Sequence, residues 1–410
     1  MSNSTAEAAP SLNPTPARLM SLDALRGFDM FWIIGAGGVV RALDSMGDNP
    51  VVRLIAGQLT HKDWEGFAFY DLIFPMFVFI VGVSLVFSLS KAMAKEGRAA
   101  SLRRVIFRGL LLVVVGIFYY GGFSNDWPGI RVLGVLQRIG LAYLFGGLIY
   151  CLAPRGSVPA IAAGLLLGYW SLMALVPIRD VTLTRPAMEK LTASLGTTNA
   201  MMAFLQTTNR VTSVYDKGRN LANHVDFLYL PGRLNDTYWD PEGLLSTLPA
   251  VASCLLGVCA GLLLRDSKKT DLGKVKLLAG CGVGLVVLGF LWGTQFPVVK
   301  KIWSSSFVCV AGGYSCLLLA SFYLIVDVWG IQKWCRPFVW IGMNPITVYV
   351  VENLIGFGRV ANRFAGGDIK RYLNNHLVNG MGDLLVAITG LALALLFCRF
   401  LYRRQIFIRL

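Results

Sequence analysis

About ten apolar stretches, each long enough to cross a lipid bilayer as a helix, divide this chain. A helical span needs about 20 mostly apolar residues. Stretches of this kind lie at 28–43, 69–90, 106–122, 132–153, 158–177, 243–264, 276–296, 304–327, 337–357 and 381–402. Only 15% of the residues are charged, too few to cover the surface of a soluble protein of this length. We therefore predict an all-α polytopic membrane protein with about 10–11 transmembrane helices.

The basic residues indicate how the chain is oriented in its membrane. A net charge of +15 is compatible with nucleic-acid binding, but the lysines and arginines gather in alternate loops. This pattern follows the positive-inside rule, so we predict no nucleic-acid partner. The orientation predicts a multi-pass protein of the inner membrane with both termini in the cytoplasm. The residues that depart from the pattern precede the last span: Arg359, Arg363, Lys370 and Arg371.

The segments between the spans predict the organisation of the chain. Residues 1–18 are rich in Ser, Thr, Pro and Ala, which predicts a disordered cytoplasmic N-terminus. This segment lacks the apolar core and cleavage site of a secretory signal, so the first span is expected to be retained. The remaining residues, 19–410, form one membrane domain with extracytoplasmic loops at 44–68 and 178–242. A loop as long as the second is more often functional or self-structured than a simple connector.

The cysteines and short motifs exclude several kinds of site. All eight cysteines lie in the expected spans or at their cytoplasmic edges, so no disulfide framework is predicted. No CxxC motif or His/Cys cluster is present, and we expect no structural metal. Neither of the glycine-rich signatures of nucleotide-binding folds follows a strand pattern.

His61 is the first candidate for a catalytic residue. It is one of three histidines in the chain, and Trp64 and Asp71 follow it within ten residues. A carboxylate near an imidazole raises its basicity and selects its tautomer, as a general base or a nucleophile requires. Asp71 itself lies near the outer end of an apolar span, where an ionisable group is costly. The alternative is that His61 is a solvated loop residue.

Further polar residues lie inside the expected spans. Gln137 and Arg138 lie in the stretch 132–153, and Asn344 and Glu352 lie in the stretch 337–357. A charge in the bilayer costs several kcal/mol unless it is paired or hydrated. We therefore expect these residues to face one interior polar cavity, with Arg138 paired to Asp71 or Glu352. The alternative is that such pairs only hold the bundle together.

The long extracytoplasmic loop ends in a cluster of aromatic and acidic residues. Trp239, Asp240 and Glu242 lie directly before the apolar stretch 243–264. Aromatic rings beside carboxylates suit the binding of a sugar. They suit a membrane-interface belt equally well, and both interpretations stay open.

Several motifs, in order along most of the chain, are familiar. They are Ser21–Gly27, His61-x-x-Trp64-x-Gly66, Asp71–Ser84, Arg131–Gly140, Trp239–Thr247 and Gly342–Pro345. On these motifs the chain resembles the heparan-α-glucosaminide N-acetyltransferase family of membrane acyltransferases, including its bacterial members.

The resemblance implies an activity and a set of functional residues. It implies that 19–410 is an acyltransferase domain that moves an acetyl group from cytoplasmic acetyl-CoA to an extracytoplasmic amino sugar. His61 corresponds to the family's essential histidine, as acetyl carrier or as base, with Asp71 orienting it. Arg138 and Asn344 would line the cavity by position. The chain has Gly35–Gly38 where characterised relatives have an Asn-containing segment, which leaves the acceptor open.

Two other functions are compatible with these residues. The buried polar groups could form the path of a sugar or anion transporter, although no inverted repeat is recognisable. An O-acetyltransferase of cell-wall or exported polysaccharide would share the chemistry and differ in its acceptor. The expected partners are acetyl-CoA, a glycan acceptor and the lipid bilayer, and a homodimer is a candidate assembly.

Overall fold

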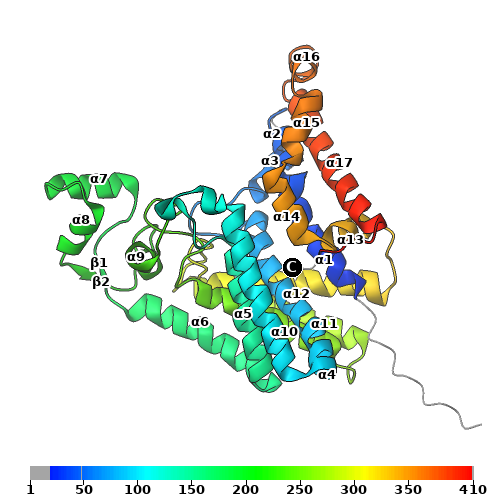
Figure 1. Cartoon of the computed structure of the whole chain (residues 1–410), viewed down its shortest axis with the longest axis horizontal. Helices are drawn as coiled ribbons and strands as arrows, with labels where there is room; N and C mark the ends of the chain where they lie inside the picture. The colour runs from blue at the N-terminus through cyan, green and yellow to red at the C-terminus, as the bar shows by residue number, and fades with distance from the viewer. Residues whose placement is uncertain (1–18, 48, 409–410) are drawn as a thin grey trace, which may run out of the picture.

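The computed structural model of the protein describes residues 19–47 and 49–408. The expected disordered segment 1–18 lies outside the described residues. Nearly all regular structure is helical (Figure 1). Within the described residues the strands are β1 (Ile178–Arg179) and β2 (Arg210–Val211), which pair antiparallel. The all-α prediction is confirmed.

The helices follow one another along the whole described chain. The first nine α-helices are α1 Met20–Phe31, α2 Gly37–Asp44, α3 Pro50–Gln58, α4 Phe69–Tyr119, α5 Val135–Leu152, α6 Val158–Leu175, α7 Arg185–Ser194, α8 Ala200–Gln206 and α9 Leu221–Tyr229. The others are α10 Thr247–Arg265, α11 Asp271–Gly293, α12 Ser305–Phe322, α13 Arg336–Gly342, α14 Pro345–Leu354, α15 Phe357–Ala365, α16 Asp368–His376 and α17 Met381–Arg403. Short π- and 3-10 segments are η1 Trp32–Ala36, η2 Gly122–Ser124, η3 Trp127–Gly129, η4 Arg155–Ser157 and η5 Tyr323–Val328.

Seven helical segments of the described chain are long and apolar enough to cross a membrane. The first, Phe69–Ser124, is 56 residues long and contains two of the expected spans. It is interrupted at Gly97, whose φ of 84° breaks the helical path of α4. A glycine adopts this backbone conformation without the steric cost that a side chain would add. The expected spans 69–90 and 106–122 therefore lie on either side of this break.

Two of the expected spans are divided into short helices. The stretch 28–43 is shared among α1, η1 and α2, and the stretch 337–357 is shared between α13 and α14. Pro345 begins α14, because proline fits the first turn of a helix and not its interior. The expected count of about ten spans is consequently not confirmed, whereas the polytopic helical architecture is.

Both expected extracytoplasmic loops contain structure of their own. Loop 44–68 contains α3, and loop 178–242 contains α7, α8, α9 and the β1–β2 pair. Figure 1 shows α7 and α8 set apart from the long helices, with α9 between them and the bundle. The long loop therefore forms a small folded unit that ends at the start of α10.

The central helices cross at glycines. A Cβ added to Gly82 of α4 would lie 1.9 Å from the carbonyl oxygen of Cys254 in α10. In the same crossing, a Cβ on Gly257 of α10 would lie 1.9 Å from the oxygen of Phe79 in α4. Helix backbones in a membrane approach this closely only where small residues face each other.

We expect Gly82→Ala to lower the free energy of unfolding by about 1–3 kcal/mol, because the helices must separate to admit the methyl group. Gly280→Ala is the matched control, since nothing lies within 4 Å of the position of its added Cβ. Thermal unfolding of both variants in detergent measures the difference. Equal unfolding temperatures for the two variants would contradict the close α4–α10 crossing.

Candidate active site

His61 and Asp71 meet at the N-terminal end of α4. Nδ1 of His61 lies 2.8 Å from Oδ1 of Asp71, ten residues along the chain. The other carboxylate oxygen, Oδ2, accepts hydrogen bonds from the backbone N–H groups of Ala68 at 3.1 Å and Lys62 at 3.3 Å. Asp71 is buried, whereas the side chain of His61 is half exposed. The backbone around the helix start therefore holds the carboxylate, and the carboxylate holds the imidazole ring.

The contact with Asp71 determines which nitrogen of His61 is available for chemistry. An ionised carboxylate can only accept hydrogen bonds, so Nδ1 carries the proton and donates it. In the neutral ring the lone pair is then on Nε2. The ring of Tyr70 packs against the imidazole with 4.7 Å between ring centroids, which further limits its rotation. A ring held in this way is suited to act as a base or a nucleophile through Nε2.

Lys300 is a third member of this group. Its Nζ atom lies 3.0 Å from Nδ1 and 3.4 Å from Nε2 of His61, and 3.5 Å from Oδ1 of Asp71. Burial lowers the pKa of Lys300, and the negative charge of Asp71 opposes that effect. A cation, an imidazole and a carboxylate therefore share one small site.

The backbone holds the His61 loop against the segment that carries Lys300. Glu65 and Val299 form an antiparallel bridge, and the N–H of Gly66 donates to the carbonyl of Val298 at 2.9 Å. Lys300 was not among the site residues predicted from the sequence. A signal was present, since two adjacent lysines follow an apolar stretch at the end opposite the basic loops.

A cavity of about 230 Å³ opens beside His61. Its polar lining side chains are His61, Lys300, Glu242, Tyr70 and Tyr349. Its other lining residues come from α1, η1, α4, the start of α5, and α14: Met30, Ile33, Ile73, Phe74, Phe77, Val135, Leu136, Ile139, Pro345 and Ile346. The walls are thus mainly apolar, and they differ from the polar cavity that we expected. Apolar walls exclude water and strengthen the electrostatic interactions of the few polar groups.

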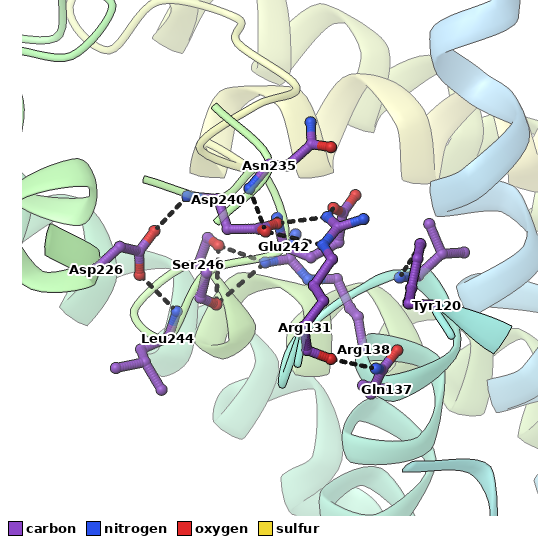
Figure 2. Close-up of polar contacts among 12 residues, drawn as sticks. Tyr120, Arg131, Gln137, Arg138, Asp226, Asn235, Asp240, Glu242, Leu244 and Ser246 are labelled. Carbon is purple, nitrogen blue, oxygen red and sulfur yellow. Dashed lines mark hydrogen bonds and ion pairs between the residues drawn. The ribbon is translucent and has the colours of Figure 1, made fainter. Parts of the chain in front are cut away.

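Arg131 gathers two carboxylates at the end of the long loop (Figure 2). Its Nε and Nη2 atoms donate to the two oxygens of Asp240 at 2.9 and 2.7 Å. Nη2 also donates to Oε2 of Glu242 at 2.7 Å. The guanidinium group lies over the ring of Tyr120, 4.5 Å from its centroid. Because the guanidinium group bonds both oxygens of Asp240, it fixes the position and the orientation of that carboxylate.

This cluster connects the cavity to the folded loop. Glu242 lines the cavity and bonds Arg131, while Asp240 is buried behind it. Burial raises the pKa of Glu242 above its ordinary value. Asp240 and Glu242 were predicted as site residues from the sequence, whereas Arg131 was recognised only as part of the motif Arg131–Gly140.

Arg138, expected in the cavity, is fully buried beside the same cluster. Its Nη2 atom donates to the carbonyl of Gly243 at 3.2 Å and to Oγ of Ser246. The guanidinium group lies 4.9 Å from the ring centroid of Trp303. These contacts differ from the expected pairing with Asp71 or Glu352, because the start of α10 supplies acceptors closer to Arg138.

The other intramembrane polar residues bond to nearby backbone. Gln137 donates to the carbonyl of Arg131 at 3.3 Å. Asn344 joins α14 to the C-terminal segment through Ile406 and Ile408, both at 2.9 Å. Glu352 accepts from the N–H of Phe357 at 3.0 Å. None of these three side chains is among the described residues that line the His61 cavity.

Two tryptophans connect the His61 loop to the long loop. Nε1 of Trp64 donates to the carbonyl of Tyr215 at 2.8 Å. Its ring meets the buried ring of Trp239 edge to face, with 5.8 Å between centroids. Trp64 and Trp239 therefore link the His61 loop to the folded long loop.

Asp226, on α9, organises the start of α10. Its carboxylate accepts from the N–H of Leu244 at 2.8 Å and of Asp240 at 3.4 Å. Burial raises the pKa of Asp226 to about 7. Nearby, His224 is buried with Nε2 3.0 Å from the carbonyl of Val181, and burial lowers its pKa. These contacts give both residues a structural role, and only Asp226 touches the cluster around Arg131.

Possible metal ligands are scattered over the fold. Across residues 19–47 and 49–408, no group of three or more His, Cys, Asp or Glu side chains is arranged to hold a metal ion. The eight cysteines, all in the described part of the chain, are free, and most are buried.

Comparisons with known proteins give one family. The sequence model described as "Heparan-alpha-glucosaminide N-acetyltransferase, catalytic" matches residues 18–198. The heparan-alpha-glucosaminide N-acetyltransferase of Homo sapiens is 26% identical over 377 residues, which cover 83% of this chain and 53% of the human protein. The Mus musculus protein of that name is 26% identical over 344 residues, covering 72% and 49% respectively. The chain thus spans about half the length of these curated relatives, and the family resemblance is confirmed.

Proposed function

Because the chain is related to the heparan-α-glucosaminide N-acetyltransferases, we propose that it is a transmembrane acetyltransferase. It transfers an acetyl group from cytoplasmic acetyl-CoA to the amine of a glucosamine-like sugar on the extracytoplasmic side of the inner membrane. The observation that carries the proposal is the His61–Asp71 pair beside a cavity with apolar walls. The basic loops support an orientation with both termini in the cytoplasm.

Two routes use the lone pair on Nε2 of His61. In the first, Nε2 bonds to the thioester carbonyl carbon, the carbon–sulfur bond breaks and the thiolate leaves. The acceptor amine then takes the acetyl group from the ring and loses a proton. In the second, Nε2 takes the proton from the amine while the amine attacks the thioester carbonyl carbon directly, the carbon–sulfur bond breaks and the thiolate leaves. Asp71 stabilises the positive charge that develops on the ring in both routes.

The acceptor amine is proposed to meet Glu242. Of the described residues that line the cavity, Glu242 carries the carboxylate, and Arg131 holds that carboxylate in place. An ammonium group is stabilised by a carboxylate in a site that excludes water. Asp240 shares Arg131 with Glu242, and Trp64 of the His61 loop packs on the buried Trp239 of the long loop, so the folded loop supports this side of the site.

Acetyl transfer by the purified protein tests the proposal. The protein in lipid nanodiscs is incubated with acetyl-CoA labelled in the acetyl group and a panel of amino sugars and neutral sugars. We expect label in an amino sugar and none in its N-acetylated form, which has no free amine. Transfer only to hydroxyl groups would support an O-acetyltransferase, and no transfer to any acceptor would overturn the proposed function.

Replacing Lys300 with methionine is expected to lower kcat/KM for acetyl transfer. The ammonium group lies 3.0–3.4 Å from the imidazole nitrogens of His61 and 3.5 Å from Oδ1 of Asp71, so its loss removes a polar neighbour that both side chains share. The measurement is kcat/KM of the variant and the wild type with the best amino sugar.

Lys300→Arg serves as the control, because it keeps the positive charge at this position. We expect it to retain more activity than Lys300→Met. Lys217→Met removes a lysine that pairs with Asp63 outside the cavity, and its kcat/KM should equal that of the wild type. A loss in Lys217→Met equal to that in Lys300→Met would contradict a local effect.

A further inference from the structure

A second cavity, of about 530 Å³, lies in a groove between α13 and α17 near the start of α1. Three arginines line it: Arg336 from α13, and Arg399 and Arg403 from the last turns of α17. The groove shares no lining residue with the His61 cavity. It is therefore a separate cavity from the one beside His61.

The positive charge of the three arginines is not neutralised by acidic residues in the groove lining. No Asp or Glu is among its lining residues, and none of the three arginines forms an ion pair with another described residue. The Nε atom of Arg399 is buried and has no hydrogen-bond partner in the described chain. A buried donor without a partner costs free energy, so the groove is built for an anionic ligand that supplies acceptors.

The shape of the guanidinium group favours phosphate. Arginine presents several N–H donors in one plane, which suit the oxygens of a phosphate better than a single charge does. Trp340 forms part of the wall, and the guanidinium group of Arg399 lies 5.4 Å from its ring centroid. Stacking on Trp340 keeps the Arg399 side chain in a fixed orientation, so part of the site is already formed without a ligand.

The surroundings of the groove favour a lipid as the source of the phosphate. Only 22% of the apolar window of α17 is buried inside the protein, so most of this helix faces lipid. Leu396 and Phe400, next to the arginines on α17, are more than half exposed. Trp340 and Tyr402 both line the groove, and such rings are enriched at the level of lipid headgroups.

We propose that the α13–α17 groove binds the phosphate of an anionic phospholipid headgroup. The acyl chains lie along the exposed apolar face of α17, and the phosphate lies among Arg336, Arg399 and Arg403. Basic pockets between transmembrane helices bind anionic headgroups in this manner. Since α13 leads into α14, which lines the His61 cavity, the bound lipid holds one wall of that cavity in position.

Native mass spectrometry of the full-length, delipidated protein tests the site with phosphatidylglycerol and phosphatidylcholine. We expect preferential binding of phosphatidylglycerol, with its affinity about 25-fold lower in Arg399→Gln/Arg403→Gln, about fivefold for each arginine. Arg233→Gln/Arg363→Gln removes the same charge from exposed positions elsewhere and should bind like the wild type. Equal weakening in both double variants, or no preference in the wild type, would overturn the proposal.

Two further measurements separate the alternatives. Arg399→Lys/Arg403→Lys keeps the charge and loses the planar donors, so we expect affinity between those of the wild type and the glutamine variant. ADP and coenzyme A are added at millimolar concentration as competitors. Loss of bound phosphatidylglycerol in their presence would assign the groove to a soluble phosphate and overturn the lipid assignment, whereas retention supports it.

Discussion

Replacing His61 with alanine is expected to lower kcat for acetyl transfer by about 10³-fold or more. The substitution removes Nε2, which takes the acetyl group or the proton in either proposed route. His61 is half exposed, so its loss should leave the fold intact. The measurement is the initial rate of label transfer from acetyl-CoA to the best amino sugar, together with the unfolding temperature.

His376→Ala is the matched control for this variant. His376 is exposed at the end of α16, where its ring stacks on Tyr372, and the His61 cavity does not involve it. Its rate should equal that of the wild type. Addition of imidazole should restore part of the activity of His61→Ala, because the space left by the ring admits a diffusible base. A wild-type rate of transfer by His61→Ala would contradict the catalytic role proposed for His61.

The same variant distinguishes the two routes. If His61 carries the acetyl group, the wild type incubated with labelled acetyl-CoA and no acceptor retains label that hydroxylamine removes. His61→Ala retains none under these conditions. If His61 is a base, neither protein retains label, although only the wild type transfers it when an amino sugar is added.

Asp71→Asn is expected to lower kcat by about 10²–10⁴-fold. An asparagine can present its amide group to Nδ1 and so favour the other tautomer of the ring. Nε2 would then carry the proton and could not act as a base.

The pair of His61 and Asp71 could be predicted because both residues lie close together in the sequence. Ten residues separate them, and the turn into the start of α4 brings them into contact. Lys300 could not be predicted in the same way, since 239 residues separate it from His61. The backbone contacts of Glu65 with Val299 and of Gly66 with Val298, which have no sequence signature, bring it to the site.

The sequence also could not predict which groups the buried charged side chains contact. A charge inside a span predicts that a partner exists, and Arg138 does have acceptors. The acceptors belong to the junction between the folded loop and α10, and their location depends on how that loop folds back. The apolar stretches, by contrast, predicted the long helices well, because hydropathy alone decides which segments can enter a bilayer. It does not decide where a glycine or proline divides them.

Replacing Arg131 with methionine is expected to lower the free energy of unfolding by about 3–5 kcal/mol, the usual cost of removing one partner of a buried ion pair. Asp240, which is buried, and Glu242, which is only slightly exposed, would be left without their shared cation. Arg131→Lys should recover only part of the loss, because lysine cannot bond both oxygens of Asp240 in one plane. Unfolding is followed with a thiol-reactive dye, since most cysteines are buried until the protein unfolds.

The loss of unfolding free energy in Arg131→Met should be larger at high pH than at low pH. Burial already raises the pKa of Glu242 in the folded protein above its ordinary value of 4.5, and removal of the cation raises it further. A carboxyl group whose pKa is higher in the folded state binds more protons there, so its contribution to stability falls as the pH rises between the two values. Arg131→Met should therefore be closer to the wild type at pH 5 than at pH 8. The triple variant Arg131→Met/Asp240→Asn/Glu242→Gln lacks both carboxylates that Arg131 bonds and should lose this additional pH dependence, whereas the contribution of Asp226 remains. A deficit in Arg131→Met that is independent of pH would mean that the arginine acts through packing alone.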